Sequence, residues 1–322
     1  AMARSLSVRV SHLSCPAPRA CLIRGMTPSH DILCIGSVLW DVIGRAHLPM
    51  RLGNDVPGRI SRGPGGVAMN IAMGLARFGL RPVLLTAIGT DAEGDELIAA
   101  CARLGLVTEH VWRPPGLPTD RYMAIESSEG LVAAIADAHT LEAAGKRILD
   151  PLEDGRIGTP DAPWTGFAAL DGNLTEALLG EIATRPALAA ADLRVAPASP
   201  GKARRLRPLI GHPAATFYVN LVEAGLILGS AFTSAPRAAE ALVEAGVSQA
   251  LVTNGAGEAA EATAAGLVVA TPPEVPQARV TGAGDTFMAA HIAAQVRGAA
   301  GATAFEIALR AAAAYVSGKD PA

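Results

Sequence analysis

Apolar residues along this chain alternate between two kinds of segment. Short continuous apolar runs at residues 31–43 and 81–89 have the length and the β-rich composition of buried strands. Residues 65–79 and 95–105 instead carry apolar side chains at helical spacing, and each segment ends in glycine, a common helix stop. Regular alternation of strand and helix predicts β-α-β units, and hence an α/β fold with a doubly wound, mostly parallel sheet.

The same alternation resumes after about residue 165. It predicts strands at 166–172, 193–199, 215–220 and 249–255, and helices at 174–185 and 237–246 and from residues 285 and 304. We therefore expect residues 30–322 to form a single domain.

A different pattern interrupts this alternation at residues 120–138. The segment has the spacing of strand, turn and strand, with residues 127–130 at the turn, which is typical of a β-hairpin. Together with a polar stretch before residue 63, it predicts a small lid formed by residues 45–63 and 117–138.

Composition and charge exclude several classes of function. Half of the 322 residues are hydrophobic and 18% are charged, and the formal net charge of -3 provides no basic surface for nucleic acid. No run of about 18 apolar residues is free of charges or breakers, so no membrane span is predicted. The four cysteines, Cys15, Cys21, Cys34 and Cys101, have neither disulfide-framework nor zinc spacing, which indicates a reducing, cytoplasmic setting.

Residues 1–29 differ from the rest of the chain. They contain four arginines and no acidic residue, and they lack the apolar core of a secretory signal. Two interpretations stay open, an amphipathic targeting peptide and a disordered extension ahead of the domain. We adopt the second as the simpler one.

The segment TGAGD at residues 281–285 joins a glycine-rich turn to a predicted helix. Glycine lets the backbone approach a ligand, so the amides of Gly282, Ala283 and Gly284 would converge at a helix N-terminus, which favours anions. Asp285 would then be placed to accept a proton from a hydroxyl that attacks phosphorus. The alternative is that the glycines only shape a turn and Asp285 only caps the helix, and this segment alone does not decide.

Polar residues also follow three other predicted elements. They are Asn70 after the glycine pair Gly65 and Gly66, Asp41 after the first strand, and Asn220 and Glu223 after the strand at 215–220. Each alone is more often a cap than a ligand, but open α/β sheets bind ligands at the carboxyl ends of strands, where a carboxylate can position Mg²⁺ through water. The chain has no GxxxxGK[ST] motif and no GxGxxG after its first strand, which argues against a P-loop enzyme and an NAD-linked enzyme.

Together these segments resemble the ribokinase-like (PfkB-type) carbohydrate and nucleoside kinases. GGVAMNIAMGLARFG (65–79) resembles the N-terminal signature of that family, and VTGAGDTFMAA (280–290) resembles its C-terminal signature. NLVE (220–223) matches its NxxE element, and GSVLWD (36–41) matches its first strand with the substrate aspartate. The resemblance implies a ribokinase-like three-layer α/β fold with a small β lid.

The resemblance also implies a role for each matching residue. Asp285 would be the base that activates the acceptor hydroxyl, with Gly282, Ala283 and Gly284 as the anion hole. The sugar would be held by Asp41, Gly65, Gly66 and Asn70, the Mg²⁺ and phosphate region by Asn220 and Glu223, and the nucleotide by Thr253 and Gly255. The implied cofactors are ATP, as phosphoryl donor, and Mg²⁺, and the lid is implied to form a homodimer contact.

Within this family the chain resembles the pseudouridine kinases most. The resemblance rests on PGRISRGPGGVAMNIA (57–72), TDRYMAIESSEGLVAAIADA (119–138) and the Val-Thr pair before the glycine turn. It implies phosphorylation of the 5'-hydroxyl of pseudouridine. Another kinase of ribokinase, fructokinase or adenosine kinase type is an alternative, as is a non-catalytic sugar- or nucleotide-binding protein, although the retained Asp285 argues against the last.

One position departs from the family pattern. Family members often have aspartate where Arg279 stands, and that aspartate helps to bind a monovalent cation. A guanidinium would repel such a cation. We therefore expect that this protein does not need potassium because the guanidinium takes its place; the alternative is that Arg279 is exposed and incidental.

Overall fold

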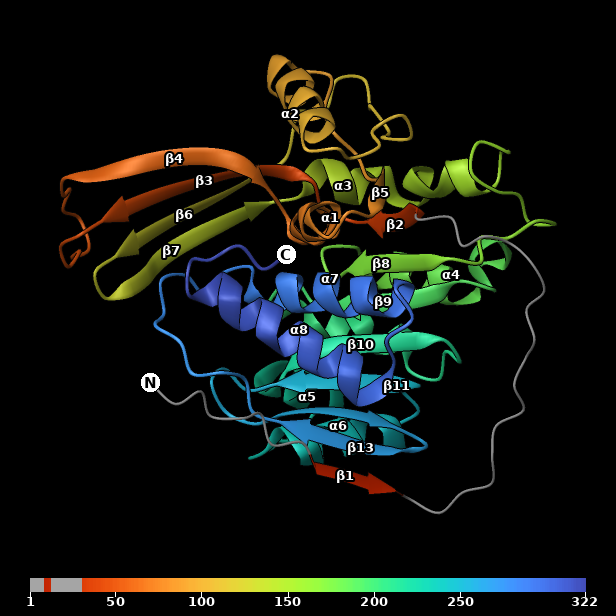
Figure 1. Ribbon diagram of the computed structural model, residues 1–322. Helices are drawn as coiled ribbons and strands as arrows, with labels where there is room; N and C mark the ends of the chain where they lie inside the picture. Colours follow the sequence, from red (N-terminus) through yellow and green to blue (C-terminus); the bar gives the residue numbers. More distant parts are fainter. Residues whose placement is uncertain (1–8, 13–30) are drawn as a thin grey trace.

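The computed structural model describes residues 9–12 and 31–322. The strands of its larger sheet are β1 (Arg9–His12), β2 (Asp31–Ile35), β5 (Arg81–Leu85), β8 (Phe167–Asp171), β9 (Asp192–Ala196), β10 (Ala215–Asn220), β11 (Gln249–Thr253), β12 (Ala259–Thr263) and β13 (Gly266–Ala270). They lie in the order β1-β13-β12-β11-β10-β9-β8-β2-β5 (Figure 1). The strands from β5 to β11 in this order are all parallel, which confirms the predicted mostly parallel sheet.

Antiparallel strands extend the sheet beyond β11. β12 and β13 form a hairpin, which the sequence pattern did not indicate, and β1 pairs with β13 at the edge. An edge strand presents unpaired backbone groups that another segment can satisfy, so four residues of the extension that we expected to be disordered form a strand instead. The rest of that extension, residues 1–8 and 13–29, lies outside the described residues.

Helices cover both faces of the sheet and complete three layers (Figure 1). One face carries α1 (Val67–Arg77), α2 (Ala92–Arg103), α7 (Ala283–Val296) and α8 (Gly301–Val316). The other carries α3 (His139–Ala144), α4 (Glu176–Thr184), α5 (Leu221–Leu228), α6 (Ala235–Glu244) and the 3-10 segments η1 (Gly145–Leu152), η2 (Pro186–Leu188) and η3 (Pro200–Leu209). After Asp31, strand β2 is apolar on both sides because Leu33 and Ile35 enter one core while Ile32 and Cys34 enter the other.

A second sheet projects from the side of the three-layer body (Figure 1). Its strands are β3 (Leu39–Ala46), β4 (Gly58–Gly65), β6 (Arg121–Ser127) and β7 (Gly130–Asp137), in the order β4-β3-β6-β7. β6 and β7 form the predicted hairpin, and β3 runs parallel to β6. The role of this sheet as a lid stays a prediction.

The prediction of one strand at residues 31–43 was wrong, because two strands in two different sheets share this run. β2 ends at Ile35, and Gly36 follows with φ of 148°, a conformation that side-chain-bearing residues rarely adopt. A Cβ atom at Gly36 would also lie 2.6 Å from the carboxyl carbon of Asp171. As a result Asp41 lies near the start of β3, and not at the end of the first strand.

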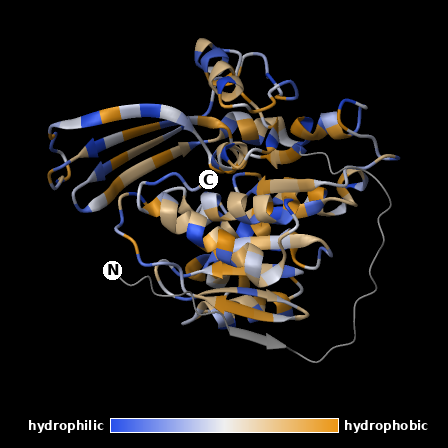
Figure 2. Ribbon diagram, in the orientation of Figure 1, coloured by the Kyte–Doolittle hydropathy of each residue, from blue (hydrophilic) through white to orange (hydrophobic). Residues whose placement is uncertain are grey.

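Hydropathy follows this architecture. In Figure 2 the strands of the larger sheet that are coloured by hydropathy are mostly orange, whereas β4 alternates between hydrophilic and hydrophobic colours. Among the described helices, none combines the length and the apolar character needed to cross a bilayer.

Cys34 and Cys101 are free, and burial raises the pKa of both thiols, which makes them poor nucleophiles.

Candidate active site

The turn before α7 is closed by local hydrogen bonds. Gly282 is the N-cap of this helix and has φ of 87°, and a Cβ atom there would lie 2.7 Å from the Tyr315 hydroxyl oxygen, so the position requires glycine. Ala283 N–H donates to the Val280 carbonyl at 3.1 Å. Presenting this amide to an anion therefore requires that bond to open.

Asp285 lies in the first turn of α7 and is bound by a side chain from a distant part of the chain. Asn70 Nδ2, on α1, donates to Asp285 Oδ2 at 2.9 Å. Burial raises the pKa of Asp285 to about 7, and the Asn70 hydrogen bond opposes that rise because it favours the charged form. The fold thus joins two predicted site residues that are 215 positions apart.

Three further carboxylates lie near enough to Asp285 to affect its pKa. Asp171, Glu223 and Asp41 all raise its pKa by like-charge repulsion. Asp41 is itself half-buried, and that burial raises its pKa to about 6. Burial likewise raises the pKa of Glu223. Neighbouring carboxyl groups whose pKa values are raised by burial, as at Asp285, Asp41 and Glu223, are typical of a site that handles protons or cations.

The glycine pair before α1 makes room for polar groups. A Cβ atom on Gly65 would lie 2.0 Å from the carboxyl carbon of Asp41, so glycine is needed for this aspartate to adopt its position. Gly66 caps α1 with φ of 97°, and a Cβ atom there would lie 2.5 Å from the Ser37 carbonyl oxygen. Gly65 thus gives the Asp41 side chain room beside the end of β4, and Gly66 lets the start of α1 approach the Ser37 backbone.

A buried hub that sequence reasoning missed holds the start of α1. Asp171, at the end of β8, is fully buried and accepts hydrogen bonds from Ser37 N–H at 2.7 Å, Ser37 Oγ at 2.6 Å, Ala68 N–H at 3.0 Å and Asn173 N–H at 2.5 Å. Asn173 in turn accepts from Lys202 Nζ at 2.5 Å. The sequence did contain a signal for Asp171, because this polar residue lies at the end of a predicted strand, as Asn220 does.

Asn220 and Glu223 form a capping box at the start of α5. Glu223 N–H donates to Asn220 Oδ1 at 2.9 Å, and Asn220 N–H donates to Glu223 Oε2 at 2.8 Å. These residues therefore have a structural role besides any binding role. Thr253 is the register partner of Asn220 in the neighbouring strand, and Gly255 lies two residues further on, in an exposed turn with φ of 57°.

The acidic residues fit a metal ion that is held mainly by water and phosphate better than one held by protein side chains alone. Within residues 31–322, no three histidine, cysteine or acidic side chains are arranged to hold a metal ion. Mg²⁺ in phosphoryl-transfer sites is usually held by one or two carboxylates, water and the phosphates. The buried carboxylate of Glu223 fits that mode.

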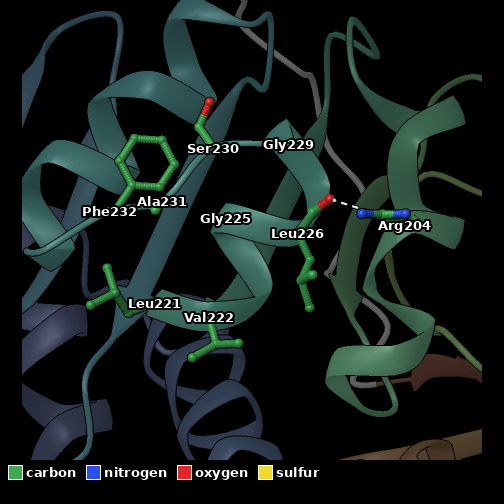
Figure 3. A pocket seen from close by; sticks show the side chains of 9 residues that line it. All are labelled: Arg204, Leu221, Val222, Gly225, Leu226, Gly229, Ser230, Ala231 and Phe232. Atoms are coloured by element: carbon green, nitrogen blue, oxygen red, sulfur yellow. Dashed lines mark hydrogen bonds between the residues drawn. The ribbon is translucent and has the colours of Figure 1, made fainter.

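A surface hollow of about 430 Å³ lies elsewhere, between η3 and the outer side of α5 (Figure 3). Its lining is mostly apolar, with Arg204 at one side, whose Nε donates to the Leu226 carbonyl at 3.4 Å. None of the predicted site residues lines it. The acidic cluster, and not this hollow, is the candidate active site.

The fold and the cluster together define a class of protein: a three-layer α/β protein with a glycine turn and a half-buried carboxylate at the start of α7. The profile of the pfkB family carbohydrate kinases matches residues 29–322, so this chain belongs to that family.

Two curated relatives share part of the sequence. The chain is 34% identical over 107 residues to pseudouridine kinase of Escherichia coli, covering 33% of this chain and 34% of that protein. It is 32% identical over 130 residues to the uncharacterized sugar kinase YeiI of the same organism, covering 40% of this chain and 36% of that protein. The matched segments thus span about a third of the length of these relatives.

Solved structures match nearly the whole chain. A carbohydrate kinase from Agrobacterium tumefaciens is 26% identical, with a TM-score of 0.71, over 88% of this chain and 89% of that one. Ribokinase from Thermotoga maritima is 21% identical, with a TM-score of 0.73, over 89% and 92%. Ribokinase from Arabidopsis thaliana, in complex with ribose and ATP, is 20% identical, with a TM-score of 0.69, over 92% and 97%. The predicted ribokinase-like fold is confirmed.

Proposed function

We propose that this protein transfers the γ-phosphoryl group of ATP to a hydroxyl group of a sugar or nucleoside. The observation that carries the proposal is Asp285, a carboxyl group at the start of α7 with a pKa raised to about 7 and a hydrogen bond from Asn70. Membership of the carbohydrate kinase family supports it.

In this proposal Asp285 is the general base. Its carboxylate accepts the proton of the acceptor hydroxyl while the hydroxyl oxygen forms a bond to the γ-phosphorus. The bond from that phosphorus to the bridging oxygen breaks, and ADP leaves with the electron pair. A base with a pKa near 7 is deprotonated often enough at neutral pH and still basic enough to take the proton.

The turn residues Gly282, Ala283 and Gly284 would stabilise the charge on the transferred group. Their backbone amides lie at the positive end of the α7 dipole. For Ala283 this role requires release of the Val280 carbonyl, so we expect the turn to adjust when phosphate binds. Asn220, Thr253 and Gly255 would bind the nucleotide.

Magnesium would be held beside the phosphates through water by Glu223, where it would neutralise phosphate charge. The carboxylate of Glu223 is already oriented by the Asn220 amide, so no rearrangement of the capping box is needed.

The acceptor would lie against Asp41, Gly65, Gly66 and Asn70, beneath a lid made of residues 45–63 and 117–138. We favour pseudouridine, phosphorylated at its 5'-hydroxyl, and the partial identity to an E. coli pseudouridine kinase supports this choice. Tyr122 supports it too, because it stands opposite Asp41 on the same face of the second sheet and would offer an aromatic surface to a base.

The direct test is ATP consumption with a panel of acceptors: pseudouridine, uridine, adenosine, ribose, fructose and 2-keto-3-deoxygluconate. We expect turnover with pseudouridine to exceed that with the others. A clear preference for fructose or adenosine would reject pseudouridine and keep the kinase. No turnover with any acceptor would instead favour a binding protein.

We further propose that the second sheet forms a homodimer contact. The face opposite Asp41 carries exposed apolar side chains: Ile60 is 80% exposed, Met123 49% and Ile135 70%. Apolar groups gathered on one sheet face are typical of a protein interface. Light scattering after gel filtration should give the mass of two chains, and Ile135→Glu should give the mass of one; a wild-type monomer would reject the contact.

We propose that activity does not depend on potassium, because the positive charge of Arg279 would repel a cation beside it. Equal rates in potassium and in potassium-free buffer are expected, and a strong potassium requirement would refute this.

We also propose a cytoplasmic location, which the free thiols of Cys34 and Cys101 support and which fractionation of cells would test.

A further inference from the structure

The segment that leads into the glycine turn is fastened to the far end of α8. Ala278 N–H donates to the Val316 carbonyl at 2.9 Å, and Arg279 N–H donates to the same oxygen at 3.2 Å. The residues before α7 are therefore bound to the place where the chain leaves α8, although about 36 positions separate the two. The position of the turn depends on this contact.

The side chain of Arg279 is the centre of the contact. Its Nε donates to the Tyr315 carbonyl at 2.8 Å, and its Nη2 donates to the Lys319 carbonyl at 3.2 Å. The guanidinium also stacks on the Tyr315 ring, with 3.8 Å between its carbon and the ring centre. The Tyr315 carbonyl lies in the last turn of α8, at the negative end of the helix dipole, so a cation is favoured beside it.

Tyr315 connects Arg279 to the glycine turn. Its hydroxyl donates to the Thr281 carbonyl at 2.8 Å. The same hydroxyl oxygen fills the space beside Gly282, since a Cβ atom there would lie only 2.7 Å from it. Arg279 thus orients the Tyr315 ring, and the ring holds the residue that precedes the α7 N-cap.

We infer that Arg279 and Tyr315 are positioning residues that fix the glycine turn and, through it, Asp285. This inference rests on the proposed phosphoryl transfer for its kinetic test. Arg279 supplies the turn with a permanent cation between two backbone carbonyls. When it is removed, those oxygens are left to accept hydrogen bonds from a small planar cation in solution, and guanidinium has the matching shape.

The experiment compares Arg279→Ala, Arg279→Lys and Tyr315→Phe with the wild type. Arg310→Ala is the matched control, because Arg310 is also exposed, lies on α8 and pairs only with a side chain one turn away. We expect kcat of Arg279→Ala to fall roughly tenfold to a hundredfold, since a small misplacement of catalytic groups has effects of that size. KM for ATP and acceptor should change much less.

Millimolar guanidinium chloride should restore kcat of Arg279→Ala and leave kcat of Tyr315→Phe low, because the latter lacks the hydroxyl and not the cation. Arg279→Lys should retain intermediate activity, since an ammonium group cannot stack on the ring and span both carbonyls equally well. Amide hydrogen exchange of residues 280–285, measured without substrates, should be faster in both Arg279→Ala and Tyr315→Phe than in Arg310→Ala.

These measurements distinguish a wrong role for Arg279 from the absence of the proposed phosphoryl transfer. Wild-type protein without turnover on any acceptor would reject the proposed function, while hydrogen exchange would still test the contact. Wild-type kcat and unchanged exchange in Arg279→Ala would overturn the inference. A loss of kcat that guanidinium does not restore, together with a lower melting temperature than that of Arg310→Ala, would also overturn it. Arg279 would then serve the general stability of the fold only.

Discussion

Replacing Asp285 by asparagine should remove catalysis and stabilise the fold at the same time. Burial raises the pKa of this carboxyl from 3.8 to about 7, so the folded state disfavours the charged form. The difference of about 3 pH units, at about 1.36 kcal/mol each, sets an upper limit of about 4 kcal/mol on what the charge costs the folded state. Asparagine has nearly the same shape and keeps an oxygen that can accept the Asn70 hydrogen bond.

The sign of the pH dependence follows from the direction of the shift. A group whose pKa is higher in the folded state binds its proton more tightly there, so its cost is absent below about pH 4, grows as pH rises, and is complete above about pH 7. Asp285→Asn should therefore match the wild type in unfolding free energy near pH 4 and exceed it at pH 8. Urea unfolding at both pH values measures the difference.

The catalytic role of Asp285 is tested by measuring the activity of the same variant. Turnover should fall by about 100-fold to 10,000-fold in Asp285→Asn, as expected for loss of a general base, while acceptor binding is largely kept. Wild-type turnover should decline as pH falls below about 7, where Asp285 is protonated. Glu258→Gln, at an exposed carboxyl group, is the control for both assays. A variant less stable than wild type at pH 8, or a stability difference independent of pH, would refute the reasoning.

Three further substitutions probe the groups around Asp285. Asn70→Ala removes a hydrogen bond that lowers the pKa of Asp285, so the acidic limb of the pH–rate profile should move to higher pH; an unmoved limb would show that this bond does not tune the base. Gly65→Ala places a Cβ atom on the Asp41 carboxyl group and should raise the acceptor KM with a smaller effect on the ATP KM, which steady-state kinetics will separate. Asp171→Ala leaves several buried donors without an acceptor and should lower the unfolding free energy by about 3 kcal/mol or more. A loss below about 1 kcal/mol in urea unfolding would show that these hydrogen bonds do not stabilise the fold.

Much of the fold was predictable because it depends on local pattern. Continuous apolar runs indicated the parallel strands, and the hairpin at 120–138 followed from its turn residues. The division of residues 31–43 was not predictable in this way, since both halves are apolar and only the close approach of Asp171 to Gly36 requires the break. The hairpin of β12 and β13 was missed because β12 is Ala-rich and lacks a strong β-forming composition.

The sequence by itself determined the alternation of parallel strands and helices, the glycine turn before α7 and the polar residues that follow several strands, because each depends on neighbours in the chain. Only the tertiary structure decided which of those residues meet. It brought Asn70 to Asp285, enclosed Asp171 among backbone amides from three segments, and placed Arg279 on the carbonyls of α8. The pKa of Asp285 has the same origin, because desolvation and charge repulsion come from groups that are distant in sequence and close only after folding.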